Sequence, residues 1–371
     1  MKAKKRRVTV KKSKSKSTKR PKRVVRKSQP RKNVKKGIVL NKSLENPILV
    51  PNRENSWESW QTFNPAAVYE NGKVHLLYRA IGEDGISVVG YASSRDGIHV
   101  DERLPRPVYL AHKPNIRASD IPYSSSPYIS GGGFGGCEDP RVTKIDDRIY
   151  MIYVAFDGAH SPGLALTHIS LEDFLKKRWK WGGVKIISAP GVIDKSGCLF
   201  PEKIKGKYVV LHRIFPNILI DFVDDLHFKK PLAGEFVIKV RKGYWDSRKI
   251  GAGAPPIKTD RGWLLLYYAV DNRDASRYKI GAMLLDLKNP TKVLYRTDQP
   301  VLEPVEWYEN EGHKSGIAYP CGAAVIDGTL FVYYGGADTV VCVATADLQE
   351  FLEALVQKRK PKLTKVSNGT R

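Results

Sequence analysis

Residues 139–157, DPRVTKIDDRIYMIYVAFD, show the pattern that decides the fold: a proline, a short strand, a tight turn and an apolar, aromatic strand. Gly or Asp stands at the turn, as is typical of β-hairpins. Four other stretches repeat the pattern: 64–80 (NPAAVYENGKVHLLYRA), 200–214 (FPEKIKGKYVVLHRI), 255–271 (PPIKTDRGWLLLYYAVD) and 319–338 (YPCGAAVIDGTLFVYYGGAD). The sequence therefore predicts five similar β units.

The spacing of the repeats predicts the architecture. Successive repeat prolines lie 75, 61, 55 and 64 residues apart, which is room for about four strands plus loops, the size of a propeller blade. We expect an all-β, five-bladed β-propeller in which equivalent positions of the repeats meet in one central pocket. Helical periodicity occurs only in short pieces, at 171–177 and 348–358, predicted as a connector and a C-terminal cap.

Charge divides the chain into three predicted parts. Of the 63 Lys and Arg residues, 19 lie in residues 1–36 and six in residues 358–371, and neither segment holds an acid. We expect both ends to be basic tails, the first of them disordered, around a neutral folded domain at 37–357. The 1–36 tail either docks to a polyanion such as RNA, DNA or an anionic surface, or is a solubilising extension.

Cysteine use and hydropathy predict a cytoplasmic protein. The four cysteines, Cys137, Cys198, Cys321 and Cys342, are far apart and form no metal-binding spacing, so we expect them to be reduced and mostly buried, with no metal site. No apolar stretch approaches the ~20 residues needed to cross a bilayer, and the basic N-terminus lacks the apolar core of a secretory signal.

The glycine run 131–136, GGGFGG, formally matches a dinucleotide-binding fingerprint. That motif requires a helix directly after it, whereas here CEDP and a β-rich stretch follow, so a nucleotide site is not predicted. We interpret the run as a loop that lets the backbone approach a ligand closely, the alternative being a merely flexible loop.

The segment Glu138-Asp139-Pro140-Arg141 holds the candidate proton donor. The other repeats place Asn64, Phe200, Pro255 and Tyr319 at the position of Asp139, so one repeat alone carries an acid there. This is the pattern expected if a single proton donor is required. The alternative is an Asx turn with a surface salt bridge.

The ends of the second strands supply basic and aromatic residues. Arg79, Arg213, Tyr268 and Asp338 occupy or follow these ends, and Lys203, Lys249 and Lys258 lie nearby in the sequence. If the repeats converge, these side chains can grip sugar hydroxyls and an anion, although each alone is more often a surface residue.

Over roughly residues 40–350 the chain resembles glycoside hydrolase family 130, the β-mannoside phosphorylases and mannosidases. The segments that carry the resemblance are GGCEDPR (135–141), FPEKIKGKYVVLHR (200–213), KIGAGAPPIKTDRGWLLLYY (249–268), YKIGAMLLDLKNPTKV (278–293), VLEP (301–304), YPCGAAV (319–325) and GAD (336–338). The resemblance implies a five-bladed propeller and an inverting reaction on a β-mannoside.

The resemblance also implies residue roles. Asp139 is expected to be the general acid, passing its proton through a sugar hydroxyl. The mannosyl-binding set is expected to be Asn64, Arg79, Tyr278 and Asp338, with Glu138 and Arg141 from the motif of the acid. The expected phosphate ligands are Arg213 and Lys249, joined by Lys203 and Tyr268.

The predicted function is therefore phosphorolysis of a β-mannoside oligosaccharide to α-mannose 1-phosphate, with phosphate as co-substrate and no other cofactor. Two departures keep an inverting hydrolase open: Tyr268 stands where these phosphorylases often carry His, and Asp194 stands near an expected Asn. An Asp there would repel phosphate and could activate water.

A non-catalytic propeller that binds glycan or a polyanion is the third alternative. A homo-oligomer is also left open, and we expect specificity to depend on the loops 101–134 and 304–318.

Overall fold

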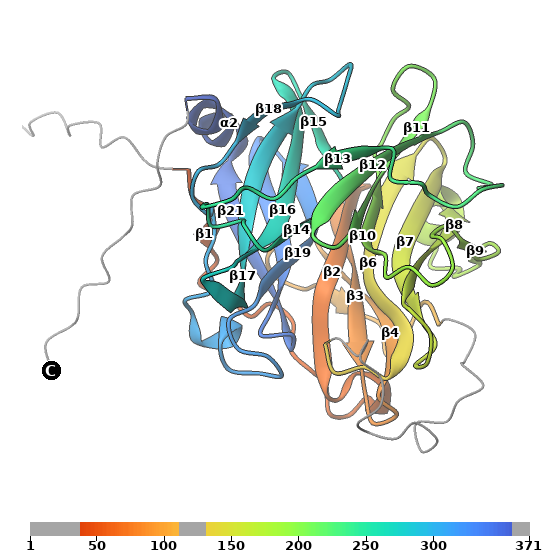
Figure 1. Ribbon diagram of the computed structural model, residues 1–371. Coiled ribbons are helices and arrows are strands. Elements are labelled where there is room, and N and C mark those ends of the chain that lie inside the picture. The colour runs from red at the N-terminus through yellow and green to blue at the C-terminus, as the bar shows by residue number, and fades with distance from the viewer. Residues whose placement is uncertain (1–37, 111–130, 358–371) are drawn as a thin grey trace, which may run out of the picture. The chain divides into compact units, whose positions relative to one another are not determined.

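The computed structural model describes residues 38–110 and 131–357. The predicted tails at 1–36 and 358–371 lie outside these residues, as does the stretch 111–130 of the first predicted specificity loop. Nearly all regular structure in the described residues is β, which confirms the predicted all-β class. Figure 1 shows the strands standing side by side in successive sheets.

The described strands form five antiparallel units, which we number in chain order. Unit 1 contains β2 (Gln61–Glu70), β3 (Lys73–Ile81), β4 (Ile86–Ser94) and β5 (Glu102–Arg103). Unit 2 contains β6 (Gly135–Ile145), β7 (Arg148–Phe156), β8 (Gly163–Ser170) and β9 (Lys185–Ile186). A short parallel pairing of β4 with β6 joins units 1 and 2 into one sheet.

The other three units are separate sheets. Unit 3 contains β10 (Lys195–Leu199), β11 (Tyr208–Ile214), β12 (Asn217–Val223) and β13 (Phe236–Ile238). Unit 4 contains β14 (Lys249–Ala252), β15 (Ile257–Thr259), β16 (Gly262–Asp271), β17 (Asp274–Leu285) and β18 (Val293–Arg296). Unit 5 contains β19 (Ala318–Ile326), β20 (Thr329–Gly336) and β21 (Val340–Asp347), and β1 (Asn41–Lys42) from the start of the described chain pairs with β21.

The predicted hairpins and helices are confirmed. Asn71-Gly72, Lys205-Gly206 and Asp327-Gly328 form turns in which both residues have positive φ, the geometry that suits a tight hairpin. The helices are α1 (Leu171–Leu175), capped by Ser170, and α2 (Leu348–Val356), capped by Asp347. Two 3-10 turns, η1 (Ser56–Glu58) and η3 (Trp307–Glu309), complete the described elements.

Buried hydrophobic clusters hold consecutive units together within the described residues. They lie between units 1 and 2 (Leu77, Met151), 2 and 3 (Val154, Val210), 3 and 4 (Leu211, Leu265), 4 and 5 (Ile280, Val332), and 5 and 1 (Val343, Leu76). The fifth cluster makes the series cyclic. Burying each such side chain contributes about 1.5–3 kcal/mol, so each unit depends on both of its neighbours.

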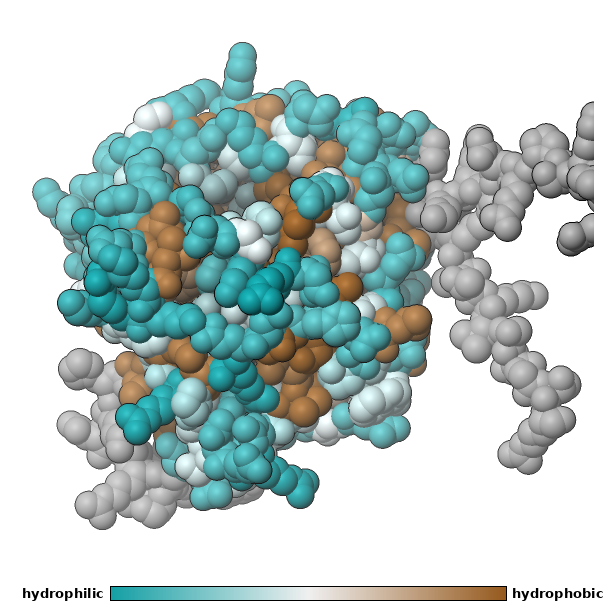
Figure 2. All heavy atoms as spheres, turned by 180° about the vertical axis from the view of Figure 1, so that it is seen from behind, coloured by the Kyte–Doolittle hydropathy of each residue, from teal (hydrophilic) through white to brown (hydrophobic). Residues whose placement is uncertain are grey.

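The surface mixes hydrophilic residues with scattered apolar ones, as Figure 2 shows for one face. Exposed large apolar side chains include Leu44, Val305 and Trp307. Such scattered groups are normal on folded proteins and require no partner. All four cysteines are buried, as predicted.

The first strand of each unit is irregular, and these irregularities position the functional side chains. The first strands β2, β6, β10 and β19 each contain a register shift, and the first strand of unit 4 is split into β14 and β15. In three of these bulges a residue has left-handed backbone: Asn64 (φ 49°), Asp139 (φ 49°) and Ser196 (φ 57°). Bulges of this kind re-aim side chains next to active sites.

The prediction that Phe200 is the equivalent of Asp139 in unit 3 was wrong. Phe200 is buried against Trp263, with the ring centroids 5.1 Å apart, and belongs to the core between units 3 and 4. The bulge that corresponds to Asp139 falls at Ser196. The reason is that Pro201 follows the end of β10, whereas Pro65 and Pro140 lie inside bulges, so the prolines are not equivalent.

Candidate active site

A cavity of about 430 Å³ receives side chains from all five units. Eight predicted site residues line it: Asn64, Arg79, Asp139, Arg213, Lys249, Tyr268, Tyr278 and Asp338. These residues come from positions as far apart in the chain as 64 and 338. The convergence of the repeats thus brings the predicted residues into one pocket.

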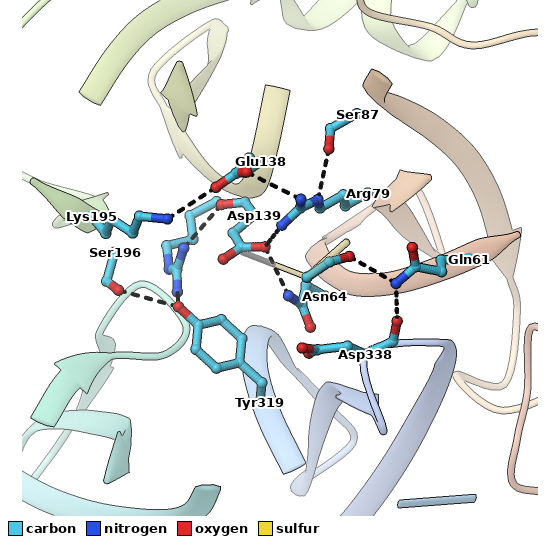
Figure 3. A network of polar contacts seen from close by, with 12 residues as sticks. Gln61, Asn64, Arg79, Ser87, Glu138, Asp139, Lys195, Ser196, Tyr319 and Asp338 are labelled. Carbon is cyan, nitrogen blue, oxygen red and sulfur yellow. Dashed lines mark hydrogen bonds and ion pairs between the residues drawn. The ribbon is translucent and has the colours of Figure 1, made fainter. Parts of the chain in front are cut away.

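One side of the cavity, here called the acid wall, consists of Asn64, Arg79 and Asp139, with Glu138 behind them (Figure 3). Asn64 Nδ2 donates to Asp139 Oδ1 at 2.7 Å, and Arg79 Nη1 donates to the same oxygen at 3.2 Å. Arg79 Nη2 lies 3.1 Å from Glu138 Oε1, and its Nε donates to Ser87 Oγ. The carboxylate of Asp139 is therefore held in one orientation.

Glu138 and Arg141 do not line the cavity. Glu138 is fully buried between Arg79 and Lys195, at 3.1 Å from each. Arg141 is also buried, and its guanidinium donates to the backbone oxygens of residues 139, 252 and 253. Strand alternation is broken at the bulge, so Arg141 supports the site from behind and is not placed to touch a ligand.

The two carboxyl groups that line the cavity have opposite pKa shifts. Burial favours the neutral form of Asp139, but Arg79, Arg141 and the Asn64 hydrogen bond outweigh it, so the pKa lies below the ordinary value. Burial raises the pKa of Asp338 to about 6, although Lys314 opposes the shift. Opposite shifts of neighbouring carboxyl groups are typical of acid–base sites.

Four cations also line the cavity and are here called the cationic wall: Lys195, Arg213, Lys249 and Lys314. Lys249 Nζ donates to Tyr278 Oη, and Lys314 lies over the same ring at 4.9 Å. Burial, followed by the charges of Arg213 and the neighbouring lysines, lowers the pKa of Lys249 to about 7. An anion placed here would relieve the repulsion between these cations.

Aromatic rings form the remaining wall. The ring centroids of Tyr268 and Tyr319 lie 4.5 Å apart, and Tyr278 packs beside both. Ser196 Oγ lies 2.8 Å from Tyr268 Oη and 3.2 Å from Tyr319 Oη. Apolar ring faces beside hydroxyl groups suit a sugar, which has C–H faces and hydroxyl edges.

The structure does not bring Lys203 to the site. Its side chain is exposed and lies over the Tyr208 ring, 4.4 Å from the centroid, and it does not line the cavity. Lys258 is likewise exposed and pairs with Glu202 at 2.7 Å. Lys203 belongs to unit 3 and Lys258 to unit 4. Both lie close to site residues in sequence, but both point to solvent.

The glycine run is a close-packing element. Gly131 and Gly132 line the cavity with positive φ (62° and 84°). A Cβ at Gly131 would lie 3.0 Å from Arg79 Nη1, and one at Gly132 would lie 2.8 Å from the His313 ring. The absence of side chains lets this backbone lie against Arg79 and His313. Its close approach to a ligand stays a prediction.

The sequence interpretation missed several residues that line the cavity, among them Lys195, His313, Lys314 and Tyr319. It also missed Ser196, which does not line the cavity but contacts the hydroxyl group of Tyr268. His313 and Lys314 come from the predicted specificity loop 304–318, whose path has no periodic signal. The sequence did contain a signal for Ser196. Asn64 precedes Arg79 by about the same number of residues as Ser196 precedes Arg213. Because the repeats were aligned on their prolines, this correspondence was missed.

Asp194, the residue that kept hydrolysis open, does not line the cavity. It is 1% exposed, and its Oδ2 lies 2.8 Å from His212 Nδ1. Residues 193 and 195 line the cavity on either side of it. The carboxyl group thus lies behind the cationic wall.

Among residues 38–110 and 131–357, no group of three or more His, Cys, Asp or Glu side chains is placed to hold a metal ion. No helix in this part of the chain is long and apolar enough to span a bilayer.

Five β units thus contribute carboxyl groups, several cations and tyrosine rings to one cavity. Residues 46–357 match the family model of glycoside hydrolase family 130, described as beta-1,4-mannooligosaccharide phosphorylase. This chain belongs to that family, which confirms the predicted resemblance.

Characterised relatives share most of their length with this chain. It is 39% identical to a 1,2-beta-oligomannan phosphorylase of Thermoanaerobacter sp. (strain X514), over 84% of this chain and 99% of the relative. It is 36% identical to a beta-1,2-mannobiose phosphorylase of the same organism, over 84% and 98% of the two chains.

The chain also superposes on solved structures of related proteins. A Listeria innocua beta-1,2-mannobiose phosphorylase in complex with beta-1,2-mannobiose superposes with a TM-score of 0.68 and 27% identity, covering 85% of this chain and 99% of that one. Another neighbour has a TM-score of 0.70 and 25% identity, covering 87% and 96%. It was described in work stating that this family of mannoside phosphorylases contains glycoside hydrolases that target beta-1,2 mannosidic linkages in Candida mannan.

Proposed function

We propose that this protein is an inverting β-mannoside phosphorylase that uses inorganic phosphate and releases α-mannose 1-phosphate. We also propose that its five units are the blades of a five-bladed β-propeller around the site. The observation that carries the activity is the cationic wall of Lys195, Arg213, Lys249 and Lys314, which faces the cavity shared with Asp139. Arg213 is buried, Lys195 and Lys249 are half-buried, and Lys314 is exposed. Like charges gathered at one cavity favour an anionic second substrate over water.

Proton transfer is assigned to Asp139. Its carboxyl faces the cavity, and hydrogen bonds from Asn64 and Arg79 fix its orientation. Because its pKa lies below the ordinary value, Asp139 must gain a proton within the reaction cycle before it acts as an acid. That proton then passes, through a sugar hydroxyl, to the glycosidic oxygen as the bond to the anomeric carbon breaks.

The nucleophile is assigned to the cationic wall. A phosphate oxygen held by Arg213 and Lys249 forms the new bond to the anomeric carbon on the face opposite the leaving sugar, which inverts the configuration. Phosphate is already anionic, so no second carboxylate base is required. Guanidinium and ammonium groups together suit this ligand, since Arg binds phosphate oxygens in pairs and Lys acts as a point charge.

We propose β-1,2-linked mannosides as the substrate class, because the two relatives described above are named for β-1,2-linked substrates. Asn64, Arg79, Tyr278 and Asp338 are proposed to bind the mannosyl residue. Beyond phosphate as co-substrate no cofactor is proposed. A cytoplasmic location, a homo-oligomer and polyanion binding by the 1–36 tail stay predictions from the sequence.

The activity is tested by incubating the protein with β-1,2- and β-1,4-mannobiose, with and without inorganic phosphate. We expect α-mannose 1-phosphate to form from the β-1,2-linked sugar, and only when phosphate is present. Cleavage that continues unchanged without phosphate would contradict the phosphorylase assignment.

An inverting hydrolase is the second candidate. The observation that favours it is the presence of a second cavity carboxyl, Asp338, besides Asp139. An inverting hydrolase needs two carboxyl groups on opposite sides of the sugar, with one of them activating water. In the phosphate-free arm of the same assay this candidate predicts release of α-mannose, which would not carry phosphate.

A further inference from the structure

A buried chain of three charged side chains lies behind the cationic wall. His212 is fully buried; its Nδ1 lies 2.8 Å from Asp194 Oδ2 and its Nε2 lies 2.8 Å from Asp221 Oδ2. Both ring nitrogens therefore face carboxylate oxygens, which requires both to carry protons. Burial alone would lower the pKa of His212, but the two carboxylates raise it to about 9.

The far end of the chain is anchored to backbone. Asp221, on β12, accepts hydrogen bonds from the N–H groups of residues 233–235 at 2.9–3.3 Å. The chain thereby ties the residue before β10, strands β11 and β12 and a following loop together. Asp194, at the near end, is held less firmly than Asp221. Among the described residues, His212 is its sole side-chain hydrogen-bond partner.

The near end adjoins two cations of the cavity. Asp194 directly precedes Lys195, and His212 directly precedes Arg213. Lys195 and Arg213 are paired across β10 and β11, and both line the cavity. Asp194 and His212 do not line it. The carboxylate and imidazolium therefore support the two strand positions that present cations to the ligand.

Two buried atoms on these strands lack partners. Asp194 Oδ1 is a buried acceptor and Arg213 Nε is a buried donor, and neither makes a hydrogen bond. An unpaired buried polar group destabilises a fold, and such groups are rare in native proteins. Here the two are complementary and belong to neighbouring positions of the same strand pair.

We propose that Asp194 is a positioning residue for Arg213: its Oδ1 accepts the Nε–H of the guanidinium during catalysis, while His212 holds the carboxylate in place through Oδ2. The two Nη groups of Arg213 then remain available for the phosphate. The negative charge of Asp194 also offsets the repulsion that Arg213 receives from Lys249. This inference rests on the proposed use of phosphate.

The inference gives Asp194 a different role from that of a water-activating base. A base must reach a water molecule in the cavity, whereas Asp194 is buried behind the wall and bound to His212. A positioning residue acts through the anion site, so its loss should change the use of phosphate and leave binding of the mannoside unchanged.

The test is the steady-state kinetics of Asp194→Asn, in which an amide replaces the carboxylate with little change of shape. We expect the KM for phosphate to rise about 10- to 100-fold, the range expected for a misplaced binding group, while the KM for the mannoside changes less than about twofold. The matched control is Glu58→Gln, which neutralises another fully buried carboxyl that contacts Arg103 and Tyr78 outside the cavity. It should leave the phosphate KM unchanged.

A double-mutant cycle separates a local effect from general damage. Arg213→Lys keeps a positive charge but removes the Nε donor. If Asp194 acts through that donor, adding Asp194→Asn to Arg213→Lys should raise the phosphate KM by no more than about twofold further. Should Asp194→Asn fail to fold, His212→Gln in both backgrounds gives the same comparison, because it removes the group that orients Asp194.

Two outcomes would overturn the inference while leaving the proposed function standing: a phosphate KM within about twofold of wild type in Asp194→Asn, or full additivity in the cycle. A wild-type enzyme that cleaves mannosides without phosphate contradicts the proposed function itself. If Asp194→Asn then abolished that phosphate-independent cleavage, the residue would be a base and the positioning role would be wrong.

Discussion

On the acid wall, Arg79 lies between the carboxylates of Glu138 and Asp139, whereas on the cationic wall Arg213 is almost as deeply buried with no hydrogen bond or ion pair within the described residues. The first wall holds a preorganised, internally compensated set of charges. On the second wall Lys195 pairs with Glu138, but the buried Arg213 has no such partner in the described part of the chain. Preorganised groups of the first kind orient a reacting group, and groups of the second kind bind an external anion.

The largest expected effect is on the acid wall. Asp139→Asn should lower kcat by about 10²–10⁴-fold, because the proton donor is lost. Asn tolerates the left-handed backbone at this position (φ 49°), so the fold should be retained. Asp146→Asn is the matched control, since Asp146 has a similar φ of 53° in an exposed hairpin turn and should show wild-type kcat. The rate of α-mannose 1-phosphate formation and thermal unfolding measure both variants.

Two arginine substitutions test the comparison directly. Arg79→Met breaks a buried ion-pair network and should lower the free energy of unfolding by about 3–5 kcal/mol. Arg213→Met removes an uncompensated cation beside Lys249, so its free energy of unfolding should change by less than about 1 kcal/mol, although phosphate use is lost. Urea unfolding of the two variants checks this. Equal destabilisation would mean that the walls do not differ as the contacts indicate.

The cationic wall should also respond to pH. Lys249 has a pKa of about 7, below the ordinary value for lysine, so it carries its charge below about pH 7 and loses it above. Affinity for an anion should therefore weaken as the pH rises, by up to tenfold per unit above the pKa. Competitive inhibition by sulfate, which stays doubly charged, measures this between pH 6 and 8.5. Lys249→Arg should flatten the profile, and a wild-type profile that is already flat would exclude the titration of Lys249.

The smallest effect is expected outside both walls. Lys203→Ala should leave the phosphate KM within about twofold of wild type and the unfolding free energy within about 0.5 kcal/mol, as is usual for a surface substitution. Lys203 is exposed over Tyr208 and lines neither wall. A large rise in the phosphate KM would show that Lys203 contributes to phosphate binding.

Much of the fold was readable from local chemistry. Asn71-Gly72 predicts a hairpin because these residues accept positive φ, and the apolar runs beside the turns predict strands. The five repeats therefore predicted five units and a shared pocket. The failure at Phe200 has an equally local cause: a bulge depends on how two strands pair, and no residue type marks it as reliably as glycine marks a turn.

The sequence by itself determined the repeated hairpins, the neutral body between basic ends and the motif that places Asp139 beside a proline. Only the tertiary structure decided which charges are compensated. Glu138 is satisfied by Arg79 and Lys195, which lie 59 and 57 residues away, and Arg213 is left uncompensated although its neighbour His212 has two carboxylates. The physical reason is that ion pairing depends on distances of a few ångströms between separate strands, which strand periodicity does not encode.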